Sequence, residues 1–106
     1  MRTIPHKEDL TVEFKSDIKN LRDNELIDEI VGMTNTKGGT LYLGVEDDGK
    51  ITGVSNMHKD VIGVTALIAN KTVPSVSVRA DIITEEGKDV LKIEIPISRT
   101  VVSTSS

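Results

Sequence analysis

Acidic side chains occur at two places in the sequence where they could hold a divalent metal ion. Glu8 and Glu13 lie near the N-terminus, and Asp47 and Asp48 lie in a segment rich in turn-forming residues. Metal-dependent phosphodiester cleavage needs two or three carboxylates around such an ion. The spacing does not fit the D-x-[DN]-x-[DN]-G loop of an EF-hand. The acids therefore predict either a metal site, if the first segment lies near the later turn, or solvated turn residues.

A second candidate is the segment Asn35–Gly39, in which Lys37 precedes two glycines. A P-loop requires G-x-x-x-x-G-K-[ST] leading from a strand into a helix. Here the order is reversed, and the nearby helix end is a C-terminus, whose partial negative charge disfavours anions. A P-loop is therefore excluded. A glycine helix cap explains both glycines by conformation alone, and a weaker contact of an anion with Lys37 and the glycine N–H groups stays open.

Basic residues form a third set of candidates, because they can hold phosphate groups without reading a base sequence. The residues in question are Lys15, Lys19, Arg22, Lys37, Lys71 and Arg79. The chain has 13 basic and 17 acidic residues and a net charge of −4. A protein that holds nucleic acid by overall charge should be basic. Any such contact must therefore use a local patch, and a scatter of solubilising charges is the alternative.

The composition narrows the class of protein. With 106 residues, 37% hydrophobic and 28% charged, the chain is expected to fold as one small domain. Phe14 and Tyr42 are the only aromatic residues, too few for a surface on which bases stack. The absence of cysteine excludes disulfides and thiolate metal sites, and His6 and His58 are expected at the surface. Without a signal peptide or a long apolar run, the expected location is the cytoplasm.

The periodicity of apolar residues predicts an α+β domain. We expect two helices packed on one face of a mixed, mainly antiparallel sheet, in the order β-α-β-β-α-β-β. The expected strands are 10–15, 40–46, 51–54, 76–82 and 91–97, and the expected helices are 23–35 and 58–71.

Local signals mark the ends of these elements. Asp23 or Asn24 can cap the first helix, and its acidic first turn suits the positive end of the helix dipole. Asp48-Gly49 predicts a two-residue type I′ hairpin turn, in which both residues have positive φ. The segment 85–88 predicts a second hairpin turn.

Three segments carry a resemblance to a known family: Glu8, the stretch VEFK at 12–15, and TNTKGGTLYLGVEDDGKITGV at 34–54. They resemble the Schlafen AlbA-like domain, which is typified by an E…EFK opening and an A-N-T-x-G-G-x-L-x-I-G-V-x-D-x-G-x-I-x-G stretch. The match covers roughly 8–97, with Thr34 in place of the usual alanine. The resemblance implies an AlbA-like fold and nucleic-acid binding. In prokaryotes it is typical of the N-terminal part of transcriptional regulators, often followed by a winged helix.

The resemblance also implies an enzymatic alternative. Related animal domains include RNA-cleaving enzymes with three acids, which by motif position fall on Glu8, Glu13 and Asp47 and would hold Mg²⁺ or Mn²⁺. Those enzymes pair two such modules, whereas one is present here. An ATP-binding label sometimes given to the family has no support in the helix polarity described above.

Three hypotheses follow. The first is a DNA-binding domain of a cytoplasmic transcriptional regulator, spanning 1–106 of a longer protein and acting as a homodimer without a cofactor. Its phosphate contacts are expected from Lys15, Lys37 and Arg79. The second is the nuclease with Glu8, Glu13 and Asp47, on DNA or RNA. The third is a dimerisation or ligand-sensing module whose DNA-binding part lies elsewhere in the protein.

Overall fold

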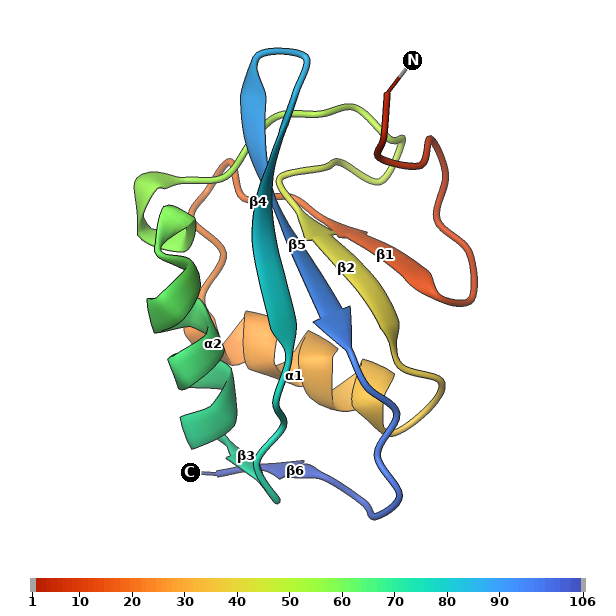
Figure 1. Ribbon diagram of the computed structural model, residues 1–106, viewed down its shortest axis with the longest axis vertical. Coiled ribbons are helices and arrows are strands. Elements are labelled where there is room, and N and C mark those ends of the chain that lie inside the picture. Colours follow the sequence, from red (N-terminus) through yellow and green to blue (C-terminus); the bar gives the residue numbers. More distant parts are fainter. Residues whose placement is uncertain (1, 106) are drawn as a thin grey trace.

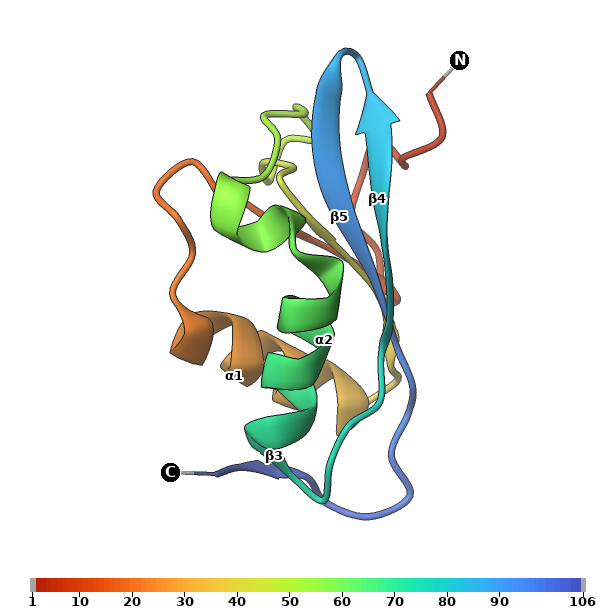
Figure 2. The ribbon, with the colours of Figure 1, turned by 60° about the vertical axis from the view of Figure 1, so that its left-hand side comes forward.

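The computed structural model describes residues 2–105, in which two helices cover one face of a four-stranded sheet (Figures 1 and 2). The strand order is β1-β2-β5-β4, with β1 parallel to β2 and the other neighbours antiparallel. The predicted α+β class and the mixed, mainly antiparallel sheet are therefore confirmed. The elements of this layer are β1 (Val12–Lys15), α1 (Asp23–Thr34), β2 (Gly39–Leu43), α2 (Val61–Asn70), β4 (Arg79–Glu85) and β5 (Lys88–Ile95).

The larger core lies between the sheet and the helices. It is aliphatic, because period-2 apolar residues of the strands meet the apolar stripes of α1 and α2. Its fully buried members include Leu26 and Ile30 of α1, Ile68 of α2 and Leu91 of β5. No helix in the part of the chain that the structure describes has the length and apolar character that crossing a bilayer requires.

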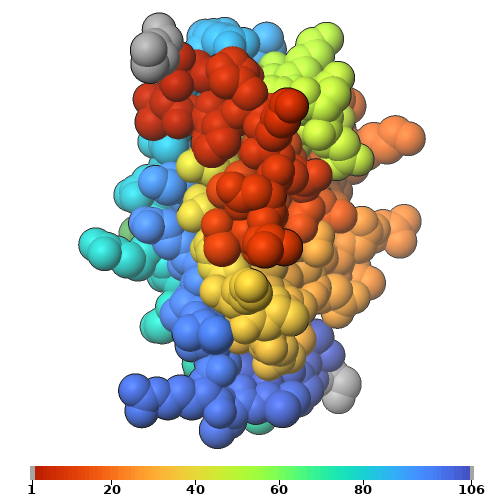
Figure 3. Space-filling view, turned by 90° about the vertical axis from the view of Figure 1, so that its right-hand side faces the viewer, coloured from red at the N-terminus to blue at the C-terminus, as the bar shows by residue number. Residues whose placement is uncertain are grey.

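A second, smaller core lies on the opposite face of the sheet. Phe14 and Tyr42 meet edge to face there, with ring centroids 6.2 Å apart and an interplanar angle of 66°. Ile4 of the N-terminal segment is buried in the same cluster. Figure 3 shows this segment lying over the β1 side of the molecule. The sheet is therefore buried on both faces near β1 and β2.

The predicted strand 51–54 is wrong. Only one isolated bridge, between Val45 and Ile51, joins it to the preceding strand. Gly44 and Gly53 have φ values of 103° and 90°, and the carbonyl of Gly44 accepts hydrogen bonds from the N–H groups of both Thr52 and Gly53. These glycine conformations bend the chain out of the extended form, so that β2 ends at Leu43 and the segment returns as a loop.

The turn at Asp48-Gly49 also differs from the prediction. Gly49 has a φ of 89°, but Asp48 is not in the positive-φ region. The N–H of Gly49 bonds to Glu46 O at 2.8 Å, which is typical of a longer hairpin loop with glycine in the left-handed position. The predicted pair of positive φ values occurs instead at Glu86 (51°) and Gly87 (76°), in the two-residue turn that joins β4 to β5.

The second helical segment is divided in two. A 3-10 helix, η1 (Asn56–Lys59), precedes α2, and the Asp60 carboxylate caps α2 by accepting from Gly63 N at 3.0 Å. The cap position of α1 is Arg22, without a side-chain hydrogen bond, so the predicted capping by Asp23 or Asn24 is wrong.

A short two-stranded sheet at the foot of the domain was not predicted. It consists of β3 (Thr72–Val73) and β6 (Ser103–Thr104), which pair antiparallel. Strands of two residues leave no readable alternation, and their pairing depends on a contact between distant segments.

Gly49 and Gly87 allow a matched test of the packing between the N-terminal segment and the hairpin loop. An added Cβ at Gly49 would overlap the backbone oxygen of His6, whereas at Gly87 nothing lies within 4 Å. Both positions have positive φ, so an L side chain costs about 1–2 kcal/mol at each. We expect Gly49→Ala to lower the free energy of unfolding by at least about 1 kcal/mol more than Gly87→Ala. Urea unfolding followed by circular dichroism measures both, and equal losses would contradict the packing.

Candidate functional site

An open groove of about 770 Å³ lies beside the end of β1. Three basic side chains, Lys15, Lys19 and Arg22, line it together with Glu25, Glu46 and Asp47. Lys15 Nζ lies 3.7 Å from Glu29 Oε1 of α1, an ion pair. Lys19 and Arg22 make no ion pair with any residue between 2 and 105. The groove therefore offers two unpaired cations, with acidic groups also in its lining.

The groove is built where β1 and β2 end side by side. The carbonyl of Lys15 accepts hydrogen bonds from Gly44 N at 2.8 Å and Val45 N at 3.4 Å. These bonds hold the 15–22 segment beside the loop that contains Glu46 and Asp47. Glu46 and Asp47 lie 24 to 32 positions after the three basic residues, so the parallel pairing of β1 with β2 is what brings them to the groove.

The Asp17 side chain anchors the segment that carries Lys19 and Arg22. Asp17 is 2% exposed, and its carboxylate accepts from Leu21 N and Ser55 N, both at 2.7 Å. It also accepts from Ser55 Oγ at 2.9 Å and lies 2.7 Å from His58 Nδ1. Burial alone would raise the pKa of Asp17, but the hydrogen bonds from Ser55, His58 and Leu21 outweigh it and hold the pKa below its usual value.

His58 was predicted at the surface, and this is wrong, because only 2% of it is exposed. Its partner Asp17 is 41 residues away, so no local pattern could reveal the contact. Ser55, His58 and Asp17 do not form a catalytic triad. Ser55 Oγ and Asp17 both lie on the Nδ1 side of the ring, and Nε2 has no hydrogen-bond partner among residues 2–105. The cluster serves as a structural anchor.

Glu8 and Glu13 form a carboxyl pair at the edge of the sheet. A hydrogen bond with Glu8 raises the pKa of Glu13 to about 7, with further increases from burial and from the charges of Glu8 and Glu29. The same hydrogen bond lowers the pKa of Glu8, whose carboxylate also accepts from Phe14 N at 2.9 Å. Between the lowered pKa of Glu8 and a pH of about 7, the pair therefore holds one proton, with Glu13 as donor and Glu8 as acceptor.

Asp47 does not join this pair. Asp47 lines the groove beside Lys15, while Glu13 lines a separate depression beside Glu29 of α1. Between residues 2 and 105, no three acidic or histidine side chains lie close enough together to hold a metal ion. The trio Glu8, Glu13 and Asp47 is thus not assembled among the described residues, and its binding of Mg²⁺ or Mn²⁺ stays a prediction.

The three predicted phosphate contacts lie on different parts of the surface. Lys15 is on the helix side of β1, in register with Leu43, whereas Arg79 is on the opposite face of β4, at the other edge of the sheet. Lys37 is exposed in the loop after α1. The structure therefore groups Lys15 with Lys19 and Arg22 and separates it from Lys37 and Arg79. The contact of each with phosphate stays a prediction.

The segment around Lys37 has a structural role. The Asn35 side chain donates to Val102 O and accepts from Val102 N, both at 2.8 Å. Gly38 has a φ of 66°, donates its N–H to Met33 O, and would bring an added Cβ within 2.6 Å of Ile95 O. These contacts match the predicted helix stop and explain both Asn35 and Gly38 without a bound anion.

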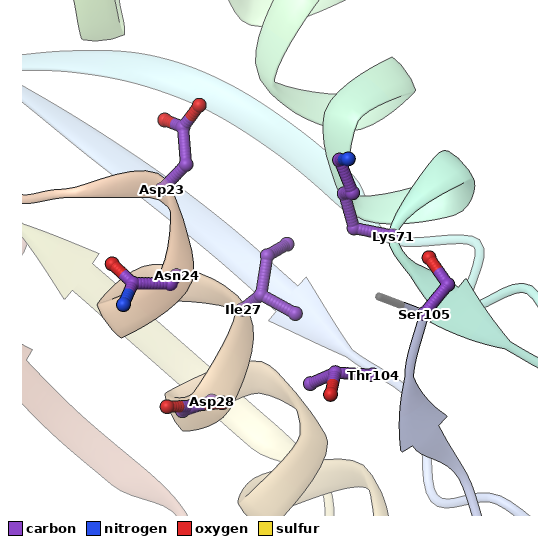
Figure 4. Close-up of a pocket in the computed structure, with 7 residues that line it drawn as sticks. All are labelled: Asp23, Asn24, Ile27, Asp28, Lys71, Thr104 and Ser105. Atoms are coloured by element: carbon purple, nitrogen blue, oxygen red, sulfur yellow. The ribbon is translucent and has the colours of Figure 1, made fainter.

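A second depression of about 370 Å³ lies at the foot of the domain (Figure 4). In the close-up, Asp23 and Asn24 at the start of α1 lie across from Lys71 and Ser105, with Ile27 between them. Its charged groups are mixed, with two aspartates, Asp23 and Asp28, and a single lysine, Lys71. It lacks the group of cations found in the groove beside β1.

The buried network predicts a large effect of Asp17→Asn. The amide can accept through only one oxygen, so the N–H group of either Leu21 or Ser55, both half-buried residues, loses its partner. We expect the free energy of unfolding to fall by about 2–4 kcal/mol. The exposed Asp28→Asn in α1 is the matched control and should change it by less than about 0.5 kcal/mol. Urea unfolding of the two variants compares them, and equal stabilities would contradict an anchoring role for Asp17.

The carboxyl pair predicts how stability depends on pH. The pKa of Glu13 rises from 4.5 to about 7 on folding, so the folded state binds a proton that the unfolded state releases. The free energy of unfolding therefore falls as pH increases from about 4.5 to about 7. Glu13→Gln keeps a donor to Glu8 but cannot titrate, so this part of the pH dependence should disappear. Thermal unfolding across this range compares the two chains, with the exposed Glu94→Gln on β5 as control. Parallel curves for wild type and Glu13→Gln would refute the shared proton.

Comparison with known proteins points to one family. The family model described as Schlafen, AlbA_2 matches residues 8–106. No curated protein matches the sequence. Among solved structures, the DIP2311 protein of Corynebacterium diphtheriae is 24% identical with a TM-score of 0.69, and the match covers 90% of this chain and 19% of that one. The N-terminal domain of an ATP-dependent DNA helicase RecG-related protein from Nitrosomonas europaea is 16% identical with a TM-score of 0.65, covering 90% and 70%. At these identities, both structures show a shared fold.

Proposed function

The chain belongs to the Schlafen AlbA_2 family, and from this premise we propose that it binds nucleic acid through phosphate contacts in the groove beside β1. The observation that carries the proposal is the convergence of Lys15, Lys19 and Arg22 on one groove, with Lys19 and Arg22 free of ion pairs among the described residues. Basic side chains at such a surface hold phosphates independently of base sequence. The RecG-related protein with the same fold is named for a DNA helicase, which supports nucleic acid as the ligand class.

The charge of the groove limits the strength of the contact. Glu25, Glu46 and Asp47 share the groove with the three bases, and the whole chain carries a net charge of −4. Few counterions are displaced by a contact with two or three phosphates, so affinity is modest and decreases with salt. Such a domain adds sequence-tolerant binding to a protein that obtains specificity elsewhere.

The finer role that we propose is DNA contact within a cytoplasmic transcriptional regulator that acts as a homodimer. The match covers 19% of the solved chain from Corynebacterium diphtheriae, so in that protein the fold is one part of a longer chain. A domain with a local basic groove and two free cations suits an auxiliary contact to the DNA backbone in such a setting.

Removing two positive charges at a time from one surface tests which surface binds nucleic acid. The double variant Lys19→Gln/Arg22→Gln should weaken binding of a short DNA duplex by about tenfold and reduce the salt slope by roughly 2. The matched double variant Lys37→Gln/Arg99→Gln removes two exposed cations outside the groove and should leave both quantities close to wild type. Fluorescence anisotropy over a series of salt concentrations measures them, with RNA of the same sequence alongside DNA. Binding that is absent, independent of salt, or lost only with Lys37 and Arg99 would overturn the proposal.

A further inference from the structure

The two edges of the sheet differ in how their outward-facing backbone groups are satisfied. At β1, the N–H of Val12 bonds to Asp9 O at 3.4 Å, and the N–H of Phe14 bonds to the Glu8 carboxylate at 2.9 Å. Figure 3 shows the N-terminal segment lying over this side of the molecule. The β1 edge is therefore closed by the chain itself, which prevents pairing with another strand.

The opposite edge, β4, is open. The two-residue turn at Glu86-Gly87 makes Glu85 and Lys88 a hydrogen-bonded pair, and the pattern alternates from there along the hairpin. Backbone hydrogen bonds to β5 therefore also come from Ile83, Asp81 and Arg79. The backbone N–H and C=O groups of Ala80, Ile82 and Thr84 point outward, away from β5. Within residues 2–105, no hydrogen-bond partner meets these outward groups. None of the seven residues of β4 is buried, in contrast to the central strands.

We propose that β4 pairs antiparallel with β4 of a second copy of this chain, centred on Ile82, so that two four-stranded sheets join into one sheet of eight strands. In this register Ile82 lies opposite Ile82 of the second copy, and Ala80 lies opposite Thr84. These are the residues whose backbone groups point outward, so every outward N–H and C=O of β4 gains a partner. The arrangement is isologous, as a two-fold symmetric dimer requires.

The side chains favour this register over its neighbours. Arg79 lies directly opposite Glu85 of the second copy, twice by symmetry, and Asp81 lies opposite the apolar Ile83. A shift by one hydrogen-bonded step places Asp81 against Asp81 in one direction and against Glu85 in the other. Like charges directly opposite each other destabilise a strand pair. The Ile82-centred register is also the one that overlaps all seven residues of β4.

Helix α2 provides an independent argument. It packs against β4 and lies beside it in both ribbon views (Figures 1 and 2). Its ten residues contain no charge, and on its outer face Ile62 is 81% exposed and Ala66 is exposed. A helix without a polar outer face is expected to be covered. Antiparallel pairing of β4 about a two-fold axis puts both copies of α2 on the same side of the joined sheet, where their apolar faces adjoin the seam.

This inference rests on the homodimer named in the proposed function and specifies its surface. The groove beside β1 lies at the opposite edge of the sheet from β4, so both copies keep it accessible. Dimer formation is measured without nucleic acid. A chain that dimerises but does not bind nucleic acid contradicts the groove proposal, and a chain that does not dimerise contradicts the β4 proposal.

Cysteine cross-linking tests the register directly, because the natural chain contains no cysteine. In the proposed dimer the two Ile82 Cα atoms are about 5.5 Å apart, within the range of a disulfide. The two Asp81 residues are diagonal neighbours about 7–8 Å apart, beyond that range. Mild oxidation should therefore convert Ile82→Cys to a covalent dimer much faster than Asp81→Cys, as seen on a non-reducing gel. Equal rates, or no cross-link from Ile82→Cys, would overturn the register.

Light scattering over a wide range of protein concentrations tests the interface itself. Arg79→Glu places two acids opposite each other at both ends of the strand pair and should weaken dimerisation by at least about tenfold. Ile62→Glu should do the same through α2. The controls are Arg99→Glu, an exposed reversal of the same charge, and Leu10→Glu, which is also 81% exposed but lies at the closed β1 edge. Circular dichroism verifies that each variant is folded. If Ile62→Glu does not fold, the result for Arg79→Glu alone tests the interface. A monomeric wild type, or a dimer weakened only by the controls, would refute the proposal.

Discussion

The structure depends on the burial of the central strands on both of their faces. Leu41, Tyr42 and Leu43 of β2 are consecutive and all buried, so neither face of the strand at this point meets water. The helices cover one face, and the N-terminal segment with Ile4 covers the other. The chain has only two aromatic residues, so the larger core is filled by aliphatic side chains, and the smaller one combines the Phe14–Tyr42 contact with aliphatic residues. A core so thin tolerates little loss of volume.

This two-sided burial also determines the chemistry available at the sheet edges. Coverage by the N-terminal segment brings Glu8 to β1, where its carboxylate accepts from Phe14 N and from the protonated Glu13. Two of the acids that suggested a metal site, Glu8 and Glu13, therefore meet at this strand edge, where Glu8 accepts from the outward N–H of Phe14. The same coverage leaves β4 as the edge with outward-facing backbone groups and no partner in the described chain.

The groove follows from long-range constraints in the same way. The parallel pairing of β1 with β2 places Lys15 beside the loop of Glu46 and Asp47, and the buried Asp17 fixes the segment of Lys19 and Arg22. Asp17 is held by the N–H of the nearby Leu21 and by Ser55 and His58 of one distant segment. The buried Asp17 carboxylate thus positions Lys19 and Arg22 in the groove. Two of its own partners, Ser55 and His58, are far away in the sequence, so no local pattern indicates the arrangement.

The sequence by itself determined the class of the fold, both helices, the main hairpin and the helix stop at Gly38, because periodicity and glycine conformation act over a few residues. It also identified the family through the segments 8–15 and 34–54, and this is confirmed by the match to residues 8–106. It failed at 51–54, where Gly44 and Gly53 bend an apparently extended segment, and at His58, which it placed at the surface. Only the tertiary structure decided that Lys15 and Arg79 lie on opposite faces, that Glu13 shares a proton with Glu8, and that Asp47 lies apart from both. The physical reason is that such placements depend on strand order and register, which result from packing between segments far apart in the chain.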